Sequence, residues 1–288
     1  MKPRVFVILL NYKGYDDTAE CIGSLRRITY PDFQVVVVDN CSGDGSYEAL
    51  TQNFPDCTVL QSGENNGFSA GNNIGIRYAL DHGADYVMLL NNDTVVSPDF
   101  LDKMTSAANR STVVTPRIYY YDNKTEIYYA AGKINQLKCT AENGDPEKSG
   151  YVDYASGCCM LIPRTVIETV GLWSEEFFLY YEDMDYSLRI LRGGFRIYYC
   201  GDAVVYHKEG RSTGKKSKTS VYYNVRNRFY IIRKYRFRRS CYYYSLFSRL
   251  IRYLQGVLTN GSGKVIMKAI RDYKAGKMGK QFPEGILR

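Results

Sequence analysis

Two short apolar runs near the beginning of the chain constrain its fold more than any other feature. Residues 5–10 and 34–39 are unbroken runs rich in β-branched side chains, as expected of parallel strands that are covered on both faces. Residues 18–28, which lie between them, have a helical pattern. The order strand, helix, strand predicts an α/β fold.

The same alternation continues to about residue 90. Residues 57–60 and 86–90 are predicted to be the next strands, and a helix is predicted between them over residues 70–80. This order favours an open sheet, in which ligands bind at the carboxyl ends of the strands. Polar residues follow three of the predicted strands at this edge: Asn11, then Asp39 and Asn40, then Asn91, Asn92 and Asp93.

The charge of the chain reverses near residue 208. Residues 1–207 carry 17 Lys and Arg against 27 Asp and Glu, a formal charge of −10, whereas residues 208–288 carry 21 against 3, a charge of +18. The basic part is also rich in tyrosine. Membrane headgroups attract basic residues at about 1 kcal/mol each, and tyrosine suits the interface. Nucleic acid is a competing partner, and a basic face that offsets the acidic body is a third interpretation.

Length and composition predict a compact protein without a membrane span. With 288 residues and 45% hydrophobic composition, the chain can bury the core of one large domain or of two closely packed lobes. Its apolar runs are strand-sized, whereas a membrane-spanning helix needs about 20 apolar residues. The eight cysteines lack metal-site spacing, and no secretory signal precedes them. We therefore expect a reducing compartment, the cytoplasm.

The residues that follow the first two strands are predicted to contact a nucleotide. Asn11 is followed by Tyr-Lys-Gly where a dinucleotide site would need its glycine-rich turn, and the chain has no Walker lysine loop. Dehydrogenases and P-loop ATPases are therefore excluded. The carboxylate of Asp39 can accept hydrogen bonds from a base or a ribose, with residues 42–46 as the turn into the next helix. A plain helix-capping turn is the alternative.

Asp93 is predicted to bind a divalent metal ion. A carboxylate at the exit of a buried strand lies where a hard cation that bridges two phosphates needs few protein ligands. A lone aspartate at a strand end is also typical of a turn. Asn91, two residues before Asp93, is predicted to contact the nucleotide. The same is predicted for three residues of the loop 65–73, namely Asn66, Gly67 and Asn72.

Three carboxylates, those of Glu182, Asp183 and Asp185, directly follow an aromatic run, residues 177–181. Like charges held close together raise one another's pKa, and burial against apolar rings raises it further, so such a cluster usually holds a proton or a cation. The same acids also favour the N-terminus of a helix through capping and the helix dipole. That simpler interpretation does not by itself account for three acids.

Taken together, these segments resemble the inverting nucleotide-sugar glycosyltransferases of family 2, and within them the rhamnosyltransferase-like branch. The resemblance runs from residue 4 to about residue 230. It is carried by residues 35–40, 66–72, 89–93 and 177–185, and by His207 with Gly210 and Ser212. It implies the GT-A fold, an α/β, Rossmann-like open mixed sheet flanked by helices, here with a basic helical C-terminal extension.

The resemblance implies a role for each main site residue. Asp39 would contact the nucleoside, Asp93 would bind the diphosphate and a divalent metal ion, Mn²⁺ or Mg²⁺, and His207 falls where related enzymes carry a further metal ligand. Asp183 would be the general base. Glu182 would orient that base or contact the acceptor.

One departure from the family pattern and one basic loop bear on the donor site. The family's metal motif is usually Asp-x-Asp, and its first position here is Asn91, which predicts a weaker metal site.

Arg211 lies with Lys215 and Lys216 in a Gly/Ser/Lys stretch that is predicted to close over the diphosphate as a mobile loop. A solvated linker is the alternative.

The combined prediction is an enzyme, an inverting glycosyltransferase. Its donor is predicted to be a dTDP- or UDP-sugar, with dTDP-rhamnose as a candidate, and its acceptor a saccharide or lipid-linked saccharide in cell-surface polysaccharide synthesis. A metal ion and basic residues would stabilise the departing diphosphate, while one carboxylate takes the proton of the acceptor hydroxyl. A single displacement of this kind inverts the anomeric carbon.

Three regions are predicted. Residues 1–110 bind the nucleotide-sugar, residues 111–218 form the acceptor-binding and catalytic half of the same domain, and residues 219–288 form a basic helical region. Apolar residues recur there at helical spacing among many arginines, which predicts an amphipathic surface helix that holds the enzyme at the inner face of the cell membrane.

Other functions stay open. A sugar-phosphate nucleotidyltransferase shares the α/β nucleotide domain but would need a glycine-rich basic loop after the first strand. A non-catalytic protein that binds nucleic acid or another anionic surface would use the basic region but leave the acidic cluster unexplained. A glycoside hydrolase would need two separated carboxylates, and the nucleotide-type strand order speaks against it.

Overall fold

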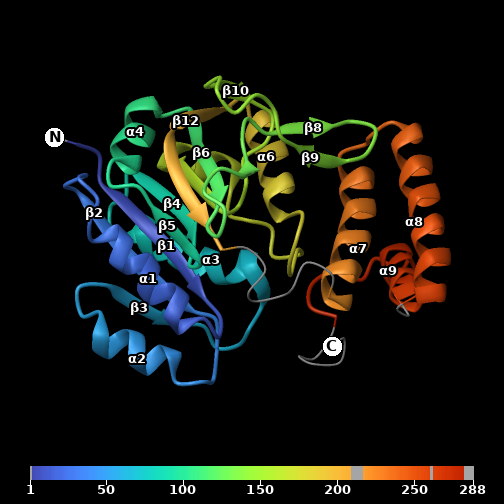
Figure 1. The fold of residues 1–288 in the computed structure, drawn as a ribbon, viewed down its shortest axis with the longest axis horizontal. Helices are drawn as coiled ribbons and strands as arrows, with labels where there is room; N and C mark the ends of the chain where they lie inside the picture. Colours follow the sequence, from blue (N-terminus) through green and yellow to red (C-terminus); the bar gives the residue numbers. More distant parts are fainter. Residues whose placement is uncertain (1, 209–216, 260–261, 282–288) are drawn as a thin grey trace.

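The computed structural model describes residues 2–208, 217–259 and 262–281 of the chain. A mixed sheet of ten strands lies at the centre of this described part (Figure 1). Its main path has the order β10-β12-β6-β11-β4-β1-β2-β3, with β5 paired to β12 and β7 paired to β6. Arg211 and its predicted basic loop lie outside the described residues.

The first half of the sheet is parallel, as the apolar runs predict. Strand β1 pairs with β2 on one side and β4 on the other, and β2 pairs with β3. The strands are β1 (Val5–Asn11), β2 (Phe33–Asp39), β3 (Thr58–Gln61) and β4 (Tyr86–Asn91). The connecting helices are α1 (Tyr15–Leu25), α2 (Ser46–Asn53) and α3 (Gly67–Asp81).

Each strand of this half contributes to two cores, because successive side chains point to opposite faces of a sheet. Val7 and Leu9 of β1 pack in one cluster with Cys21 of α1, whereas Phe6 and Ile8 pack in another with α3. All of these side chains are fully buried. The prediction of strands covered on both faces is confirmed.

The second half of the sheet is mixed. Strand β11 runs antiparallel to both β4 and β6, and β12 runs parallel to β6 with an irregularity after Cys200. The strands are β5 (Thr94–Val96), β6 (Thr112–Tyr120), β7 (Ile127–Tyr129), β10 (Gly150–Val152), β11 (Cys159–Pro163) and β12 (Arg196–His207). The helices are α4 (Phe100–Ala107), α5 (Arg164–Val170) and α6 (Glu182–Arg192).

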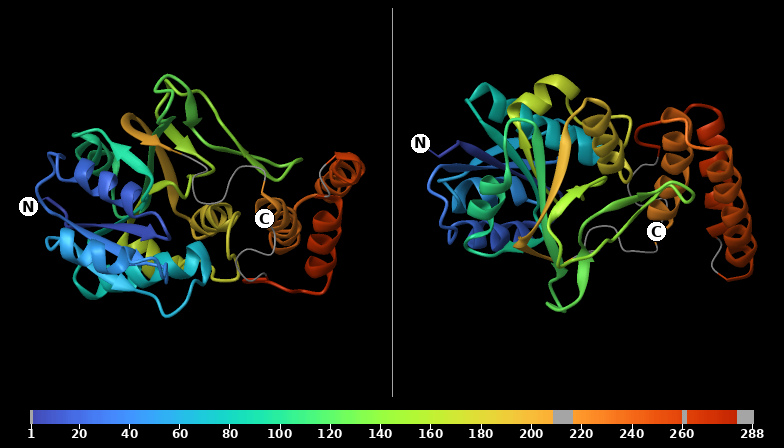
Figure 2. Two further views of the ribbon diagram at one scale, coloured as in Figure 1. Left: turned by 60° about the horizontal axis from the view of Figure 1, so that its bottom comes forward. Right: turned by 90° about the horizontal axis from the view of Figure 1, so that it is seen from above.

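A separate hairpin, β8 (Lys133–Asn135) and β9 (Thr140–Glu142), extends from this half toward the C-terminal helices (Figure 1). Those helices are α7 (Lys218–Lys234), α8 (Arg239–Thr259) and α9 (Ser262–Lys274). Figure 2 shows them side by side beyond the sheet, with α7 nearest to it. Among the described residues, no helix has both the length and the apolar character that crossing a bilayer requires.

Helix α7 is not the surface helix that its arginine-rich sequence predicts. Its apolar side packs on α9 and α8, and its opposite side contacts the segment that precedes α6. Arg226 is 0% exposed, because its guanidinium lies over the rings of Tyr222 and Tyr223 and donates to the carbonyl of Gly279 at 2.8 Å. A buried arginine is tolerated here because its positive charge is stabilised by the π faces of the two rings and by the hydrogen bond to the carbonyl.

Candidate active site

The ends of β1 and β2 form a closed polar network. Asn11 donates through Nδ2 to Asp39 Oδ1 at 2.7 Å, and the backbone N–H of Ser42 donates to Asp39 Oδ2 at 3.0 Å. The Ser42 hydroxyl also donates to Asp39 Oδ1. Both Asn11 and Asp39 are 0% exposed. A nucleoside would therefore reach the Asp39 carboxylate only where it displaces one of these internal donors.

A cavity of about 510 Å³ opens next to this network. It is lined from the end of β2 by Asn40, from the end of β3 by Ser62, and from the N-terminus of α3 by Asn66 and Ala70. Ligands of open α/β sheets bind at this edge. Asn72 does not line the cavity: it is 2% exposed and its Nδ2 donates to the carbonyl of Phe68 at 2.9 Å, one turn earlier in α3.

Gly67 brings the loop of residues 65–73 into contact with the aromatic run, residues 177–181. It has φ +90°, and a Cβ at this position would lie 2.1 Å from the carbonyl oxygen of Phe178. The next residue, Phe68, donates its N–H to that same oxygen at 2.9 Å. Only glycine fits here, because the backbone is left-handed and the neighbouring chain is in contact.

Asp93 and His207 meet although they come from distant parts of the sequence. Strand β12 pairs with β5 so that His207 faces Thr94, and His207 Nε2 lies 3.1 Å from Asp93 Oδ1 and 3.4 Å from Asn91 Nδ2. Asp93 is partly exposed, whereas the His207 side chain is 5% exposed. Its Nδ1 is buried and has no hydrogen-bond partner within the described part of the chain.

This pair fits a divalent metal ion that is only partly held by the protein. A carboxylate oxygen and an imidazole nitrogen converge, and both are common ligands of Mn²⁺ and related ions. Among the described residues no group of three or more His, Cys, Asp or Glu could hold a metal ion. The remaining ligands would have to come from a bound phosphate and water, as is usual for Mg²⁺-type sites.

Asp183 is half-buried at the N-terminus of α6 and held by two donors. The hydroxyl of Tyr154 and the backbone N–H of Gly157, at 3.3 Å, both donate to its Oδ2. Burial raises the pKa of Asp183, and the hydrogen bond from Tyr154 partly opposes that rise. Tyr154 is kept neutral, because burial and the Asp183 charge raise its own pKa well above 10.0. The arrangement suits a carboxylate that acts as a general base.

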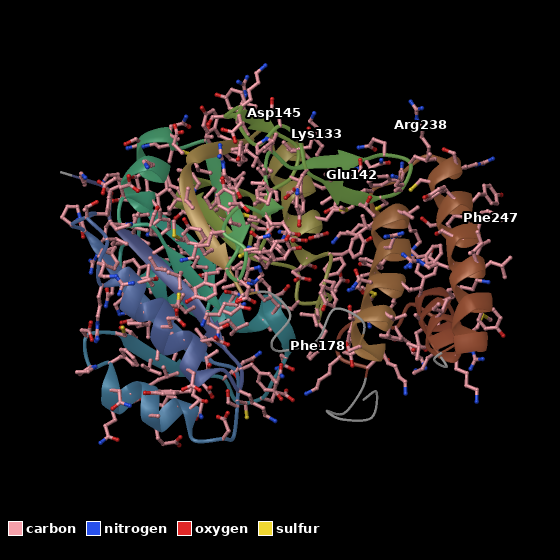
Figure 3. The ribbon with its side chains drawn as sticks, in the orientation of Figure 1. Lys133, Glu142, Asp145, Phe178, Arg238 and Phe247 are labelled. Carbon is pink, nitrogen blue, oxygen red and sulfur yellow. The ribbon has the colours of Figure 1, made fainter. Side chains whose placement is uncertain are left out.

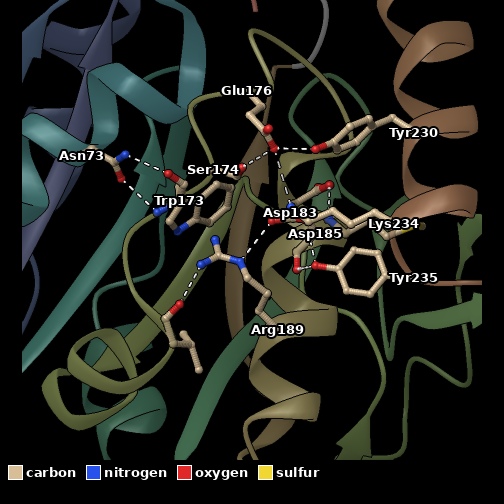
Figure 4. A network of polar contacts seen from close by, with 12 residues as sticks. Asn73, Trp173, Ser174, Glu176, Asp183, Asp185, Arg189, Tyr230, Lys234 and Tyr235 are labelled. Carbon is tan, nitrogen blue, oxygen red and sulfur yellow. Dashed lines mark hydrogen bonds and ion pairs between the residues drawn. The ribbon is translucent and has the colours of Figure 1, made fainter. Parts of the chain in front are cut away.

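The other two acids of the cluster differ sharply. Glu182 is 7% exposed, its Oε2 has no hydrogen-bond partner in the described chain, and burial followed by the Asp183 charge raises its pKa well above 4.5. Asp185 is 0% exposed and fully paired, with Arg189 at 3.0 Å and with Lys234 and the Tyr235 hydroxyl at 2.8 Å (Figure 4). Asp185 therefore joins α6 to α7, which leaves Glu182 and Asp183 for chemistry.

The backbone just before these acids is strained. Tyr180 and Tyr181 have φ of 66° and 72°, the left-handed region that bulky residues rarely adopt. Each such residue costs about 1–3 kcal/mol and persists only where its surroundings fix it. Strain of this kind directly before Glu182 is typical of a functional site.

The Asp93–His207 pair and the acidic cluster lie at the same end of β4. The N–H of Asn91 donates to the carbonyl of Cys158 at 2.8 Å, and the adjacent Gly157 binds Asp183. A second connection is aromatic: the Tyr128 ring packs edge-on against His207, with centroids 4.6 Å apart, and lies close enough to Tyr154 to affect its pKa. The two predicted acidic groups thus adjoin one strand end rather than opposite surfaces.

Three residues of this arrangement escaped sequence reasoning: Tyr128, Tyr154 and Gly157. None stands in a motif, and each acts through a contact with a residue that is remote in sequence. Asn73 is a fourth, since it exchanges hydrogen bonds with the backbone of Trp173 at 2.9 and 3.0 Å and so fixes α3 to the segment before α6 (Figure 4). For Asn73, the only signal in the sequence was its place beside Asn72 in the asparagine-rich loop of residues 65–73.

Comparison with known proteins gives one family and several relatives. The family model described as Glycosyl transferase family 2 matches residues 5–171. A low-salt glycan biosynthesis hexosyltransferase, Agl10 of Haloferax volcanii, is 28% identical over 77% of this chain and 73% of its own length. The dTDP-rhamnosyl transferase RfbF of Shigella flexneri is 29% identical over 81% of each. An N-acetylglucosaminyl-diphospho-decaprenol L-rhamnosyltransferase of Mycobacterium tuberculosis is 26% identical over 73% and 77%.

Solved structures support the fold. The mannosyltransferase PcManGT of Pyrobaculum calidifontis, in complex with GDP-Man and Mn²⁺, superposes with a TM-score of 0.60 over 98% of this chain and 77% of its own, at 16% identity. At this identity the likeness concerns the fold alone. The family match ends at residue 171, before Glu182 and Asp183, so the residues of the acidic cluster are assigned from geometry.

Proposed function

The chain belongs to glycosyl transferase family 2, and on that basis we propose that it transfers a sugar from a nucleoside-diphosphate donor to a hydroxyl acceptor with inversion of the anomeric carbon. It is a glycosyltransferase with the GT-A fold. The observation that carries the proposal is the half-buried Asp183, which is held by Tyr154 and Gly157 at the strand end that also presents Asp93.

Asp183 takes the proton of the acceptor hydroxyl. Its raised pKa gives it a stronger pull on a proton than an ordinary carboxylate. The Tyr154 hydroxyl and the Gly157 N–H both donate to Oδ2 and fix its position. Oδ1 accepts a hydrogen bond from the N–H of Met184 at 2.8 Å and keeps a further lone pair for the proton of the acceptor. Glu182, whose pKa burial raises, orients Asp183 or contacts the acceptor.

Asp93 and His207 hold the divalent metal ion and, through it, the diphosphate. When bound, Mn²⁺ or Mg²⁺ would neutralise charge on the departing diphosphate. Asn66 lines the cavity proposed for the donor, while the buried Asn11, Asp39 and Asn72 would support its walls through their internal hydrogen bonds. Asn91 offers an amide in place of the usual carboxylate, so the metal contributes less to donor binding than in a site with two aspartates. Arg211 is proposed to contact the diphosphate.

The donor and acceptor classes follow from the named relatives. RfbF is a dTDP-rhamnosyl transferase, and the mycobacterial relative acts on a diphospho-decaprenol-linked saccharide. We therefore propose a dTDP- or UDP-sugar donor, with dTDP-rhamnose as the first candidate, and a lipid-linked saccharide acceptor in cell-surface polysaccharide synthesis.

A thermal-shift screen of nucleoside diphosphates tests the donor site. dTDP or UDP, with Mn²⁺ present, is expected to raise the Tm, and the increase should be smaller without the metal. In Asp93→Asn the nucleotide effect should persist but its dependence on Mn²⁺ should disappear. Indifference of the wild type to every nucleotide would contradict the proposed donor class, and an unchanged Mn²⁺ effect in the variant would contradict the role of Asp93.

The proposed acceptor places the enzyme at an anionic membrane surface, and α8 rather than α7 is the helix that suits this contact. Its outward side exposes Tyr243 (65%), Phe247 (63%) and Leu250 (53%), which recur at helical spacing. Phe247 points away from the protein, and Arg238 stands at the N-terminal end of the same helix (Figure 3). No Asp or Glu occurs between residues 218 and 271. Basic and apolar side chains on one helix are typical of interfacial binding.

Replacing Tyr243, Phe247 and Leu250 by serine is expected to weaken binding to phosphatidylglycerol vesicles by about tenfold or more, because three exposed apolar side chains no longer enter the interface. Flotation or sedimentation with vesicles measures this. Met267→Ser, which removes an apolar side chain of similar exposure (49%) from α9, is the matched control. Equal binding of the triple variant and the wild type would exclude α8 as the contact.

A further inference from the structure

We propose that Asn227, on the C-terminal helix α7, is a positioning residue for the catalytic carboxylates. Its side-chain amide holds the strained backbone immediately before Glu182 and Asp183, and thereby sets the direction in which α6 presents them. The inference rests on the proposed role of Asp183 as the base. It gives α7, which lies outside the family match, a part in catalysis.

The contacts of Asn227 are specific. Its Nδ2 donates to two successive carbonyls, those of Leu179 at 2.9 Å and Tyr180 at 2.7 Å. Its Oδ1 accepts from Arg226 Nε at 2.9 Å. Because an arginine can only donate, this third contact fixes which end of the amide faces the carbonyls. Asn227 is 0% exposed, so no water competes for these bonds.

The segment that Asn227 holds would not keep its shape unaided. Tyr180 and Tyr181 are both in the left-handed region, with φ of 66° and 72°, and neither is a glycine or asparagine. Tyr181 is the residue that precedes α6, and its carbonyl accepts the N–H of Asp185 at 2.9 Å. A return of either tyrosine to negative φ would therefore rotate the first turn of α6, where both acids lie.

Other contacts hold the segment at different points, whereas Asn227 binds the carbonyls of Leu179 and Tyr180. Phe68 binds the carbonyl of Phe178, two residues before Tyr180. The Tyr181 hydroxyl donates to the carbonyl of Cys139 at 3.0 Å and accepts from Arg228 Nε at 2.7 Å, which fixes the ring rather than the backbone. Removal of the Asn227 amide should thus loosen the direction of the acids while the segment stays attached.

The expected consequence is a loss of turnover without a loss of donor binding. Displacement of a catalytic group by about 1 Å can cost about 100-fold in rate. The residues with proposed donor contacts lie elsewhere: Asp93 follows β4, His207 ends β12 and Asn66 precedes α3. None of them takes part in the hydrogen bonds of Asn227. The Michaelis constant for the donor should therefore stay within about threefold while kcat falls by about 10- to 100-fold.

The experiment compares Asn227→Ala and Asn227→Asp with Asn224→Ala. Asn227→Asp keeps the acceptor for Arg226 and removes both donors, so its kcat should fall at least as far as that of Asn227→Ala. Asn224 is the matched control: it lies on the same helix, but its Nδ2 donates to Ser220, one turn earlier, at 3.0 Å to the carbonyl and at 3.4 Å to the hydroxyl. Steady-state kinetics at a temperature where all variants are folded give kcat and the donor KM separately.

Amide hydrogen exchange supplies a readout that does not depend on activity. Residues 179–185 should exchange faster in both Asn227 variants, and at the wild-type rate in Asn224→Ala. Wild-type kcat in Asn227→Asp, or a rise in donor KM with kcat unchanged, would overturn the inference. Absence of transfer in the wild type would instead count against the proposed function, and exchange at residues 179–185 would then still decide whether Asn227 holds the strained backbone.

Discussion

Asparagine in place of Asp183 is expected to lower kcat by about 10²- to 10⁴-fold, the usual contribution of a general base. The replacement keeps the shape of the side chain and an oxygen that accepts from Tyr154 and Gly157. It removes the lone pair that takes the proton of the acceptor. Nucleotide affinity should be nearly intact, because Asp183 lies on α6 and the cavity of the donor site is lined from β2, β3 and α3.

The pH dependence of the wild type provides an independent test of the same residue. Burial raises the pKa of Asp183 above its ordinary value of 3.8, and the base acts only when ionised. The rate should therefore be full above the raised pKa and fall as the pH drops through it, with a midpoint above 3.8. A kcat profile recorded from pH 4 to pH 8, roughly the range in which buried carboxylates titrate, measures this midpoint.

Asp145→Asn is the control for the loss of one negative charge, since Asp145 is exposed and lies at the top of the molecule in Figure 3. It should leave kcat unchanged. Turnover of Asp183→Asn at more than about a tenth of the wild-type rate would show that another group takes the proton, and Glu182 would be the next candidate.

Alanine in place of Gly67 is expected to lower the free energy of unfolding by about 3 kcal/mol or more. A left-handed backbone at a non-glycine residue costs about 1–3 kcal/mol, and here φ is +90°. The added Cβ would also lie 2.1 Å from the carbonyl oxygen of Phe178. Backbone on both sides of the contact has to move, so the loop of residues 65–73 and the segment before Glu182 should separate and activity should be lost as well.

Urea denaturation of Gly67→Ala measures the change in stability, with Gly63→Ala as the matched control. Gly63 lies in the same connection between β3 and α3, has no positive φ, and has open space where its Cβ would be built. Its replacement should change the free energy of unfolding by less than about 0.5 kcal/mol. Equal stability of the two variants would mean that the contact between Gly67 and Phe178 is not maintained in solution.

Much of the parallel half of the sheet could be predicted from local pattern alone. The runs that became β1 and β2 are continuous and β-branched, and a strand buried on both faces needs such a sequence. Their polar ends had to lie together because parallel strands end at one edge of the sheet. The prediction for α7 failed for the converse reason: periodicity showed an apolar side among arginines, but not that Tyr222 and Tyr223 would enclose Arg226.

The acidic cluster shows the same limit. Sequence alone placed Glu182, Asp183 and Asp185 together, yet it did not reveal that Asp185 is neutralised by Lys234 and Arg189, or that Oε2 of Glu182 has no hydrogen-bond partner in the described chain. Those differences arise from α7, which meets α6 only in the folded protein. The pKa of a carboxylate depends on burial and on the charges around it, and neither is a property of its neighbours in sequence.

The sequence by itself determined the parallel half of the sheet, the edge of the sheet at which polar residues gather, and the chemical types of the residues there. Periodicity and residue type are local, and they suffice for these features. Only the tertiary structure decided which residues meet: Asp93 with His207, Asp183 with Tyr154, Gly67 with Phe178, and Asn227 with the strained backbone before α6. Each of these contacts joins segments that are remote in the chain, and packing, not local preference, brings such segments together.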